Sequence, residues 1–249
     1  MPFTEKSLDF LDENHRRNDR DWFNQHRSEY DDHVRRPMLE LAERLIPTVL
    51  RIDPLLIAEP KRAVCRIHRD TRFSRDKSMF KRASWLVFQR SKGMVHPVWF
   101  FEFTPDFHHY GCGYYTTPPK VMDQVRQFVL ADDKRFAAAD KAVASLPGCE
   151  LVGDYYKRPR YPDHPEKKRA WLERRGVSAI IHKEDTAALY AKDLHKKVAK
   201  AFTALAPFYE LLMQAHANAT PNTATSANSG RAGRGQAAAT RYDEDEDEW

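Results

Sequence analysis

The sequence predicts an α+β fold, with a single domain whose mainly antiparallel sheet is flanked by N-terminal and C-terminal helices. Two observations predict this class. Between residues 62 and 116, β-branched and aromatic residues alternate with polar ones, as in consecutive strands. Before and after this region, apolar residues recur at helical spacings, so helices and strands are grouped rather than interleaved. With 249 residues, 41% of them hydrophobic, the chain can bury one sizeable core.

The N-terminal segment predicts helices. Leu8 and Leu11 belong to a short opening helix, and the stretches 19–34 and 37–50 continue with apolar residues at helical spacings. Pro37 lacks a backbone donor, so we expect a break in the helical run there.

The remaining elements follow from turn signals and from the change of period along the chain. Expected strands cover residues 62–72, 84–90, 97–104, 111–116 and 177–182. Expected helices cover residues 118–130 and 132–145, a short segment through Trp171 and Leu172, and a final amphipathic helix from Leu189 to Leu212. A proline-rich linker, "YKRPRYPDHPEKKR", separates the two groups of helices.

The last part of the chain, residues 217–249, is rich in Ala, Thr, Asn and Gly and ends in the acidic run "DEDEDE" before Trp249. It has too few large apolar residues to offset the entropy of ordering, so we expect a disordered tail after a single domain of residues 1–216. The whole chain has a formal charge of +5, but the tail holds six acids and three arginines. The body therefore has 38 Lys and Arg against 30 Asp and Glu, which suits anionic partners but is also common in ordinary soluble proteins.

Several classes of protein are disfavoured by the sequence. No stretch approaches the ~20 apolar residues that a membrane-spanning helix needs, and acids occupy the place where an export signal has its apolar core. The three cysteines lie far apart, which favours a reducing compartment, so a cytoplasmic protein without membrane contact is expected. The P-loop, G-x-S-x-G and H-E-x-x-H signatures are absent, and no cofactor is expected.

The densest charge lies in "RIHRDTRFSRDKSMFKR", residues 66–82, which holds seven cations and two acids. If residues 62–72 form a strand, Arg66, Asp70 and Arg72 share one face and Arg69 points to the other. Guanidinium groups at this spacing can grip a carboxylate or a phosphate. The resulting hypothesis is an anion pocket, with the ligand-binding candidates Arg66, Arg69, Asp70, Arg72, Asp76 and Lys77.

A structural alternative stays open for the same residues. Arginines and aspartates can form an ion-pair lattice that joins the sheet to the N-terminal helices, and removing one partner of a buried pair typically costs about 3–5 kcal/mol.

The same stretch resembles the signature of the family called domain of unknown function 2461, found in many bacteria and in parts of longer fungal proteins. The signature has Arg-x-x-Arg-Asp-x-Arg-Phe, followed by Asp-Lys and a tyrosine. The matching positions here are Arg66, Arg69, Asp70, Arg72, Phe73, Asp76 and Lys77. Met79 stands where the family usually has proline, and Phe80 where it has tyrosine, which argues against a phenolic hydroxyl as an essential acid or base.

The resemblance extends to two outlying pieces, "NDRDWFNQHRSEY" near the start and "YKRPRYPDHP" before the short helix, and spans roughly residues 3–214. It implies no activity, because the family has none assigned.

Three other places hold groups with catalytic or metal-binding chemistry. Glu102 in "VWFFEFT" is either an ion-pair partner for Arg69 or Arg72 or a general base. The stretch "DFHHYGCG" contains zinc-ligand types, but no second pair closes a tetrahedral site and adjacent strand histidines point to opposite faces, so a turn is favoured and no metal is expected. In "YPDHP", Asp163 either pairs with His164 or caps the next helix.

Three functions therefore stay open. The leading hypothesis is binding of a small phosphorylated or carboxylated anion in the Arg/Lys-rich pocket. The second is a metal-independent hydrolase or transferase that uses Asp70 or His164 as its acid–base group. The third is weak nucleic-acid binding by the basic body, with an affinity that falls steeply as salt rises.

Overall fold

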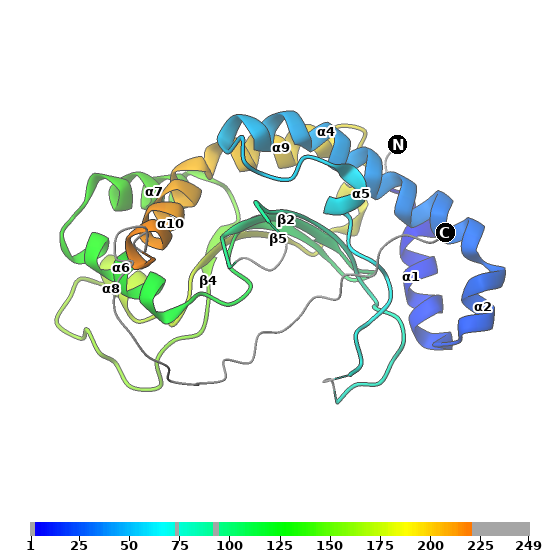
Figure 1. Cartoon of the computed structure of the whole chain (residues 1–249), viewed down its shortest axis with the longest axis horizontal. Coiled ribbons are helices and arrows are strands. Elements are labelled where there is room, and N and C mark those ends of the chain that lie inside the picture. The colour runs from blue at the N-terminus through cyan, green and yellow to red at the C-terminus, as the bar shows by residue number, and fades with distance from the viewer. Residues whose placement is uncertain (1–2, 73–74, 92–94, 221–249) are drawn as a thin grey trace, which may run out of the picture.

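A computed structural model of the chain describes residues 3–72, 75–91 and 95–220. These residues form an α+β fold in which helices pack on one face of a five-stranded antiparallel sheet (Figure 1). The predicted fold class is therefore confirmed. The predicted tail lies outside the described residues except for its first four, and α10 (Ala206–Ala219) continues past the expected domain end at residue 216.

The strand order in the sheet is β1-β2-β3-β5-β4, and every neighbouring pair is antiparallel. The strands are β1 (Ser84–Phe88), β2 (Val98–Phe103), β3 (His108–Gly113), β4 (Cys149–Val152) and β5 (Ser178–Lys183). The first three follow each other in the chain and lie side by side, as grouped strand patterns predict.

The sheet differs from the sequence-based prediction in three places. The predicted strand 62–72 is wrong, because its first residues belong to the short helix α5 (Pro60–Ala63) and only Val64 and His68 make isolated bridges. β3 begins at His108 rather than at residue 111. β4 has four residues, "CELV", which are too few to show an alternation in the sequence.

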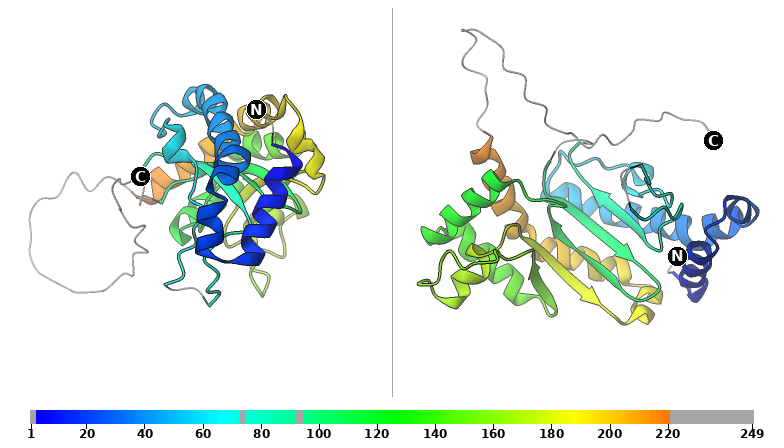
Figure 2. Two further views of the ribbon diagram at one scale, coloured as in Figure 1. Left: turned by 90° about the vertical axis from the view of Figure 1, so that its right-hand side faces the viewer. Right: turned by 90° about the horizontal axis from the view of Figure 1, so that it is seen from below.

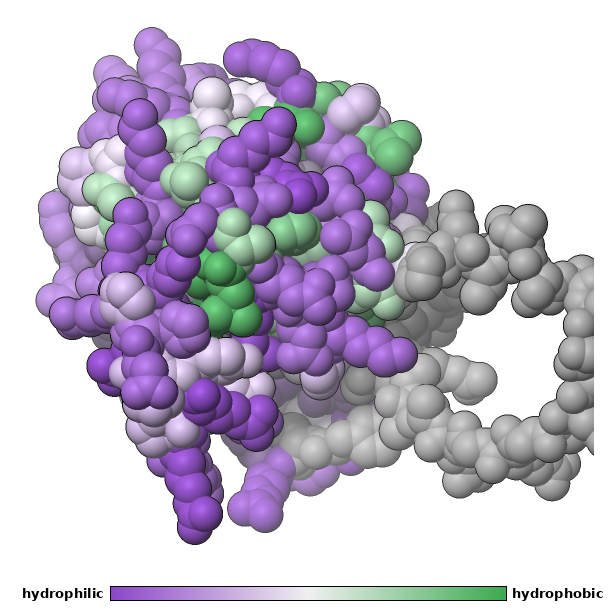
Figure 3. Space-filling model, turned by 90° about the vertical axis from the view of Figure 1, so that its left-hand side faces the viewer, coloured by the Kyte–Doolittle hydropathy of each residue, from purple (hydrophilic) through white to green (hydrophobic). Residues whose placement is uncertain are grey.

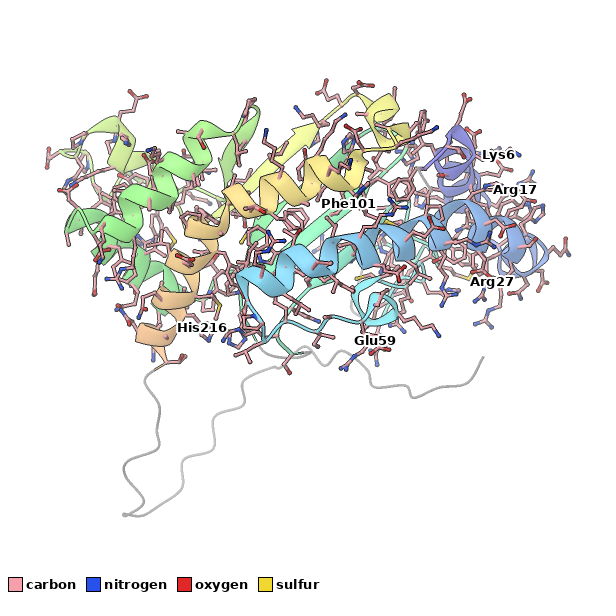
Figure 4. The ribbon with its side chains drawn as sticks, turned by 90° about the horizontal axis from the view of Figure 1, so that it is seen from above. Lys6, Arg17, Arg27, Glu59, Phe101 and His216 are labelled. Atoms are coloured by element: carbon pink, nitrogen blue, oxygen red, sulfur yellow. The ribbon has the colours of Figure 1, made fainter. Side chains whose placement is uncertain are left out.

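Alternation along the strands gives the sheet two different faces. One face carries fully buried side chains, including Leu86, Trp99 and Phe101, and packs under α4 (Arg36–Ile52) and α9 (Leu194–Ala204). In the view of Figure 4, Phe101 lies between these two helices. No helix of the described ranges crosses the opposite face, which is visible from below in Figure 2. This uncovered face carries the polar groups of the candidate site.

The N-terminal helices gather at one end of the sheet (Figure 1). They are α1 (Glu5–Arg17), α2 (Arg20–Gln25), α3 (Arg27–Tyr30) and a π-helical turn (Asp31–Arg35) that runs directly into α4. The break expected at Pro37 is therefore wrong. Pro37 lies in the first turn of α4, directly after the π-helical turn, and the backbone stays helical through both. The changed hydrogen-bond spacing of a π-helical turn just before a proline lets the helix continue although the proline N–H is missing.

The other end of the sheet is formed by α6 (Pro119–Leu130), α7 (Lys134–Ser145) and α8 (Glu166–Leu172), with α10 packed on α6 and α7. The single final helix expected between Leu189 and Leu212 is instead a 3₁₀ turn (Thr186–Tyr190) followed by α9 and α10. Pro207 explains the division, because a proline inside one continuous helix breaks its hydrogen bonding. No helix in the described residues is long and apolar enough to cross a bilayer.

A loop of residues 153–165 hangs from this end, on the uncovered side of the sheet (Figure 1). Two buried charged side chains hold it. Arg126 of α6 donates to the Tyr156 hydroxyl at 2.9 Å and to two backbone carbonyls, and Glu173 accepts from the backbone N–H of Arg160. These charges are fully hydrogen-bonded, so the loop has a fixed position. Hydrophilic side chains cover most of this end of the molecule (Figure 3).

His108 gives the folded protein a defined sensitivity to acid. Its side chain is buried on the helix-covered face, Nδ1 has no partner among the described residues, and burial lowers the pKa to about 4. An unfolded histidine has a pKa of about 6.5, so between pH 6.5 and 4 the unfolded chain binds more protons and the folded state loses stability as the pH falls.

We expect His108 to cost about 2 kcal/mol of unfolding free energy between pH 7 and pH 5, and the substitution His108→Gln to remove that part of the drop. Urea unfolding of both proteins at the two pH values measures it. His96 and His216, whose pKa values burial also lowers, leave a residual drop in the variant. An undiminished drop in the variant contradicts the assignment to His108.

Candidate functional site

The basic cluster lies on an arm, residues 64–82, that projects from the edge of the sheet on the uncovered side (Figure 1, cyan). Residues 73 and 74, with the signature's Phe73, lie outside the described residues. The Cys65 N–H donates to the Trp85 carbonyl and ties the arm to β1. Farther out, Arg69 N–H donates to the Met79 carbonyl and Lys81 N–H to the Ile67 carbonyl, so the arm doubles back on itself.

The arm is fixed against the N-terminal helices by Phe80. Its ring is 1% exposed and lies 4.9 Å from the Phe23 ring and 5.1 Å from the His68 ring, measured between centroids. The Phe80 carbonyl lies 3.2 Å from Nδ1 of His15, and the backbone N–H of the preceding residue, Met79, donates to Oδ1 of Asn18 at 2.6 Å. Phe80 therefore serves packing, which is consistent with the absence of a phenolic hydroxyl at this position.

Within the arm, most of the predicted ligand-binding candidates pair with each other. Asp70 accepts from Nε and Nη2 of Arg72 at 3.2 and 2.9 Å, and these hydrogen bonds lower the pKa of Asp70 to about 2. Arg69 contacts Asp76 at 2.6 Å, and Lys77 donates to the Thr71 carbonyl at 2.7 Å. All these side chains are at least one-third exposed, so the pairs shape the arm without being buried in it.

The side chains of Arg66, Asp70 and Arg72 are not arranged as the strand prediction implies. Because the segment is not a strand, Asp70 pairs only with Arg72 within the described part of the arm, and the charge of Arg66 acts on Asp70 without a hydrogen bond.

The structural ion-pair lattice is present at a different arginine. Arg82 donates to Asp12 of α1 at 2.7 Å and also hydrogen-bonds Asp106 in the turn between β2 and β3. It thus joins the arm, the sheet and the N-terminal helices. Its hydrogen bonds to both carboxylates raise the pKa of the Arg82 guanidinium.

Three cations crowd together where the arm leaves the sheet, and we call Arg66, Arg69 and Lys81 the cationic corner. The Lys81 ammonium lies 3.9 Å from the centroid of the Trp85 ring and donates to the Arg66 carbonyl at 2.9 Å. Burial lowers the pKa of Lys81, and the charges of Arg66 and Arg69 lower it further. Among the described residues, no hydrogen bond or ion pair engages the Arg66 side chain, so only Arg69 has a carboxylate partner here.

Arginines of the arm and of the N-terminal helices also act together on His68. Burial against Phe23 and Phe80 lowers the pKa of His68, and the charges of Arg27, Arg66 and Arg20 act in the same direction.

Next to the corner, four side chains form a row across the uncovered face. The antiparallel registers pair Trp85 with Glu102, Glu102 with His109, and His109 with His182. His109 Nε2 donates to a carboxylate oxygen of Glu102 at 2.9 Å. Glu102 is therefore the partner of a histidine, and not of Arg69 or Arg72 as the ion-pair alternative proposed.

A shallow, open hollow of about 600 Å³ lies at the β4–β5 end of this row. It is lined by His109, Gly148, Glu150, Val152, Ile180, His182, Lys183 and Glu184. None of the six predicted ligand-binding residues lines it.

The other candidates are spread over the fold. His108 and His109 lie in β3 and point to opposite faces, as expected for adjacent strand residues. No group of three or more metal-ligating side chains occurs among the residues that the structure describes. His164 lies in the 153–165 loop, 6.0 Å from the Tyr161 ring between centroids. This loop and the arm that carries Asp70 lie at opposite ends of the sheet (Figure 1).

A comparison with protein families identifies the chain. The family model described as "Conserved hypothetical protein (DUF2461)" matches residues 6–211. The chain belongs to this family. A search of curated proteins found no match. The match covers the arm, the row and the 153–165 loop of this DUF2461 protein, and the family description names no activity.

Sequence reasoning missed the parts of the site in this DUF2461 protein that depend on strand register. His182 ends an alternating strand pattern and could have been noted as an outward-facing residue. The pairing of His109 with Glu102, and the position of Lys81 over Trp85, leave no local signal in the sequence because the partners belong to different elements.

Proposed function

We propose that this DUF2461 protein binds a small phosphorylated or carboxylated anion at the cationic corner. The observation that carries the proposal is the concentration of charge there. Lys81 packs over Trp85 and donates to the Arg66 carbonyl, and its pKa is lowered by burial first and then by the charges of Arg66 and Arg69. One carboxylate, Asp76, pairs with Arg69. An anion between these cations relieves their repulsion and gains charge-assisted hydrogen bonds.

The rest of the signature has a supporting role in this proposal. Asp76 orients Arg69, and Asp70 orients Arg72, so that guanidinium groups are held in place before a ligand arrives. Lys77 ties the arm by its bond to the Thr71 carbonyl. The exposed part of Trp85 offers an apolar surface for the uncharged part of the ligand.

Asp70 is a less suitable acid–base group than the second hypothesis requires. With a pKa of about 2, it is a weak proton acceptor near neutral pH. That alternative has no further observation in its favour.

Titration calorimetry and thermal-shift measurements with inorganic phosphate, nucleoside monophosphates, sugar phosphates and dicarboxylates test the proposal. For a ligand that binds, we expect Arg66→Ala to weaken the affinity roughly 10–100-fold, because a charge-assisted hydrogen bond contributes about 1.5–3 kcal/mol. The melting temperature of the free protein should hardly change, since the Arg66 side chain has no partner within the described residues.

Arg82→Ala is the matched structural variant. It removes the exposed ion pairs to Asp12 and Asp106, so we expect a loss of about 1 kcal/mol in unfolding free energy and an unchanged affinity. Arg44→Ala, on the helix-covered side, should alter neither quantity. The proposal is wrong if no anion binds to the wild type, or if the Arg66 and Arg82 variants lose affinity equally.

A further inference from the structure

We infer that His109 and His182 form a general acid–base pair that cleaves a ribonucleotide-type phosphodiester, one with a free hydroxyl beside the phosphate. The inference rests on the proposed anion binding, because the cationic corner holds a second anionic group of the same substrate. The reaction would take place on the uncovered face of the sheet, where both histidines lie.

The hydrogen bond to Glu102 fixes the tautomer of His109. The carboxylate of Glu102 can only accept a hydrogen bond, so the proton between the two side chains belongs to Nε2 of His109. In the neutral ring, Nδ1 is then a proton acceptor, and it has no hydrogen-bond partner among the described residues. Glu102 also stabilises the imidazolium that forms when Nδ1 takes up a proton. This places His109 in the role of general base and Glu102 in the role of a positioning residue.

The two imidazoles of His109 and His182 are close enough to contact one phosphoryl group. His109 and His182 are direct neighbours on adjacent antiparallel strands, and their ring centroids are 6.1 Å apart. With hydrogen bonds of about 2.6–3.2 Å from each ring, a single phosphoryl group can contact both. His182 is exposed, so it can donate a proton to a group that arrives from solvent.

Aromatic side chains pack against the His109 and His182 rings. Phe107 lies against both rings, with centroids 5.3 Å from His109 and 4.9 Å from His182, and Phe100 meets the His109 ring edge-on at 5.4 Å. These contacts hold the two imidazoles in their positions before a substrate binds, which is the condition for efficient proton transfer.

The charged side chains around the hollow favour one direction for the substrate chain. Lys183 lines it together with both histidines and can neutralise a phosphoryl group there, whereas the exposed carboxylates of Glu150 and Glu184 repel further phosphates on that side. The substrate chain must therefore extend the other way along the row, past Glu102 and Trp85 toward Arg66 and Lys81. Two strand spacings separate His109 from Trp85, on the order of 10 Å, which a short oligonucleotide spans. The Trp85 and Phe100 rings on the way can stack on bases.

The side chains that line the hollow indicate the source of the nucleophile. Among the described residues that line the hollow there is no serine, threonine or cysteine, so we expect the attacking oxygen to come from the substrate or from water. A hydroxyl beside the phosphate is already in position to attack, which favours a ribonucleotide over a deoxyribonucleotide.

The reaction balances with these groups alone. His109 Nδ1 takes the proton of the 2′-hydroxyl while the 2′-oxygen forms a bond to phosphorus. The bond from phosphorus to the 5′-oxygen breaks with its electron pair, and protonated His182 gives its proton to that oxygen. The products are a 2′,3′-cyclic phosphate and a 5′-hydroxyl, and exchange with water restores both histidines.

The test uses the full chain and a short single-stranded oligoribonucleotide with a fluorophore and a quencher, at low salt. We expect cleavage that gives a cyclic phosphate end, with a bell-shaped pH–rate profile. His109→Ala and His182→Ala should each lower the rate roughly 10²–10⁴-fold. Glu102→Gln keeps a hydrogen-bond acceptor but removes the charge, so it should shift the acidic limb of the profile to lower pH, and Glu102→Asp should restore part of that shift.

Two controls make the outcome unambiguous. His195→Ala, on α9 and away from the hollow, should retain the full rate, and equal rates in all purified variants reveal a contaminating nuclease and overturn the inference. Binding is measured separately, by fluorescence anisotropy with the all-deoxy oligonucleotide, which cannot be cleaved by this route. If Arg66→Ala weakens that binding but wild type does not cleave RNA, the acid–base pair is wrong and the anion site stands. If the deoxy oligonucleotide does not bind and phosphates do not either, both proposals fail.

Discussion

Replacement of Asp53 by alanine is expected to destabilise the protein by about 3–5 kcal/mol, the cost of leaving a charge without its partner in a buried pair. Asp53 is 3% exposed at the end of α4, where it accepts from Arg90 Nε at 2.6 Å and from the Tyr209 hydroxyl. Burial on its own raises the pKa of this carboxyl, but the hydrogen bonds from Arg90 and Tyr209 outweigh it and the pKa is lowered. One side chain thus joins α4, the end of β1 and α10.

Urea unfolding at pH 7 measures the effect, with Asp32→Ala as the control. Asp32 pairs with Arg36 on the exposed side of the helix, so its removal should cost less than about 1 kcal/mol. Similar losses in the two variants contradict the importance assigned to the buried network.

Gly111→Ala is expected to cost about 3 kcal/mol or more, because the added methyl group cannot be accommodated without moving a neighbouring strand. A Cβ atom at Gly111 would lie 2.0 Å from the backbone carbonyl oxygen of Ala179 in β5. Backbone atoms in a paired strand cannot rotate away as a side chain can. The β3–β5 pairing, and with it the alignment of His109 with His182, depends on this close approach.

Gly148→Ala provides the comparison, since a Cβ there would meet only the flexible end of the Lys183 side chain, at 3.4 Å, but the residue has a φ of +73°. Alanine there should cost about 1 kcal/mol, the usual penalty for an L-residue in the left-handed region. Thermal or urea unfolding of both variants separates the two mechanisms. If Gly111→Ala is no more destabilised than Gly148→Ala, the strands tolerate separation and the steric argument is wrong.

The grouping of helical and strand patterns was sufficient to predict the α+β class, because burial of one face imposes a period of two on strands and of 3.6 on helices. The sequence-based prediction was wrong where a local pattern competed with tertiary contacts. The alternation in 62–72 is real, but among the described residues the segment makes only isolated bridges, at Val64 and His68, so no continuous strand forms. Pro37 signals a break, but the helical backbone continues through it from the π-helical turn into α4.

The candidate site shows the same division. The sequence by itself determined that a dense basic signature exists, that its acids can hold its arginines, and that the chain is a DUF2461 protein. Those properties are local, since charge density and i, i+2 pairs such as Asp70–Arg72 need no long-range contact. Only the tertiary structure decided which cations converge and which histidines meet. Lys81 reaches Trp85, and Glu102 reaches His109 and through it His182, because strand register brings together residues that lie far apart in the chain.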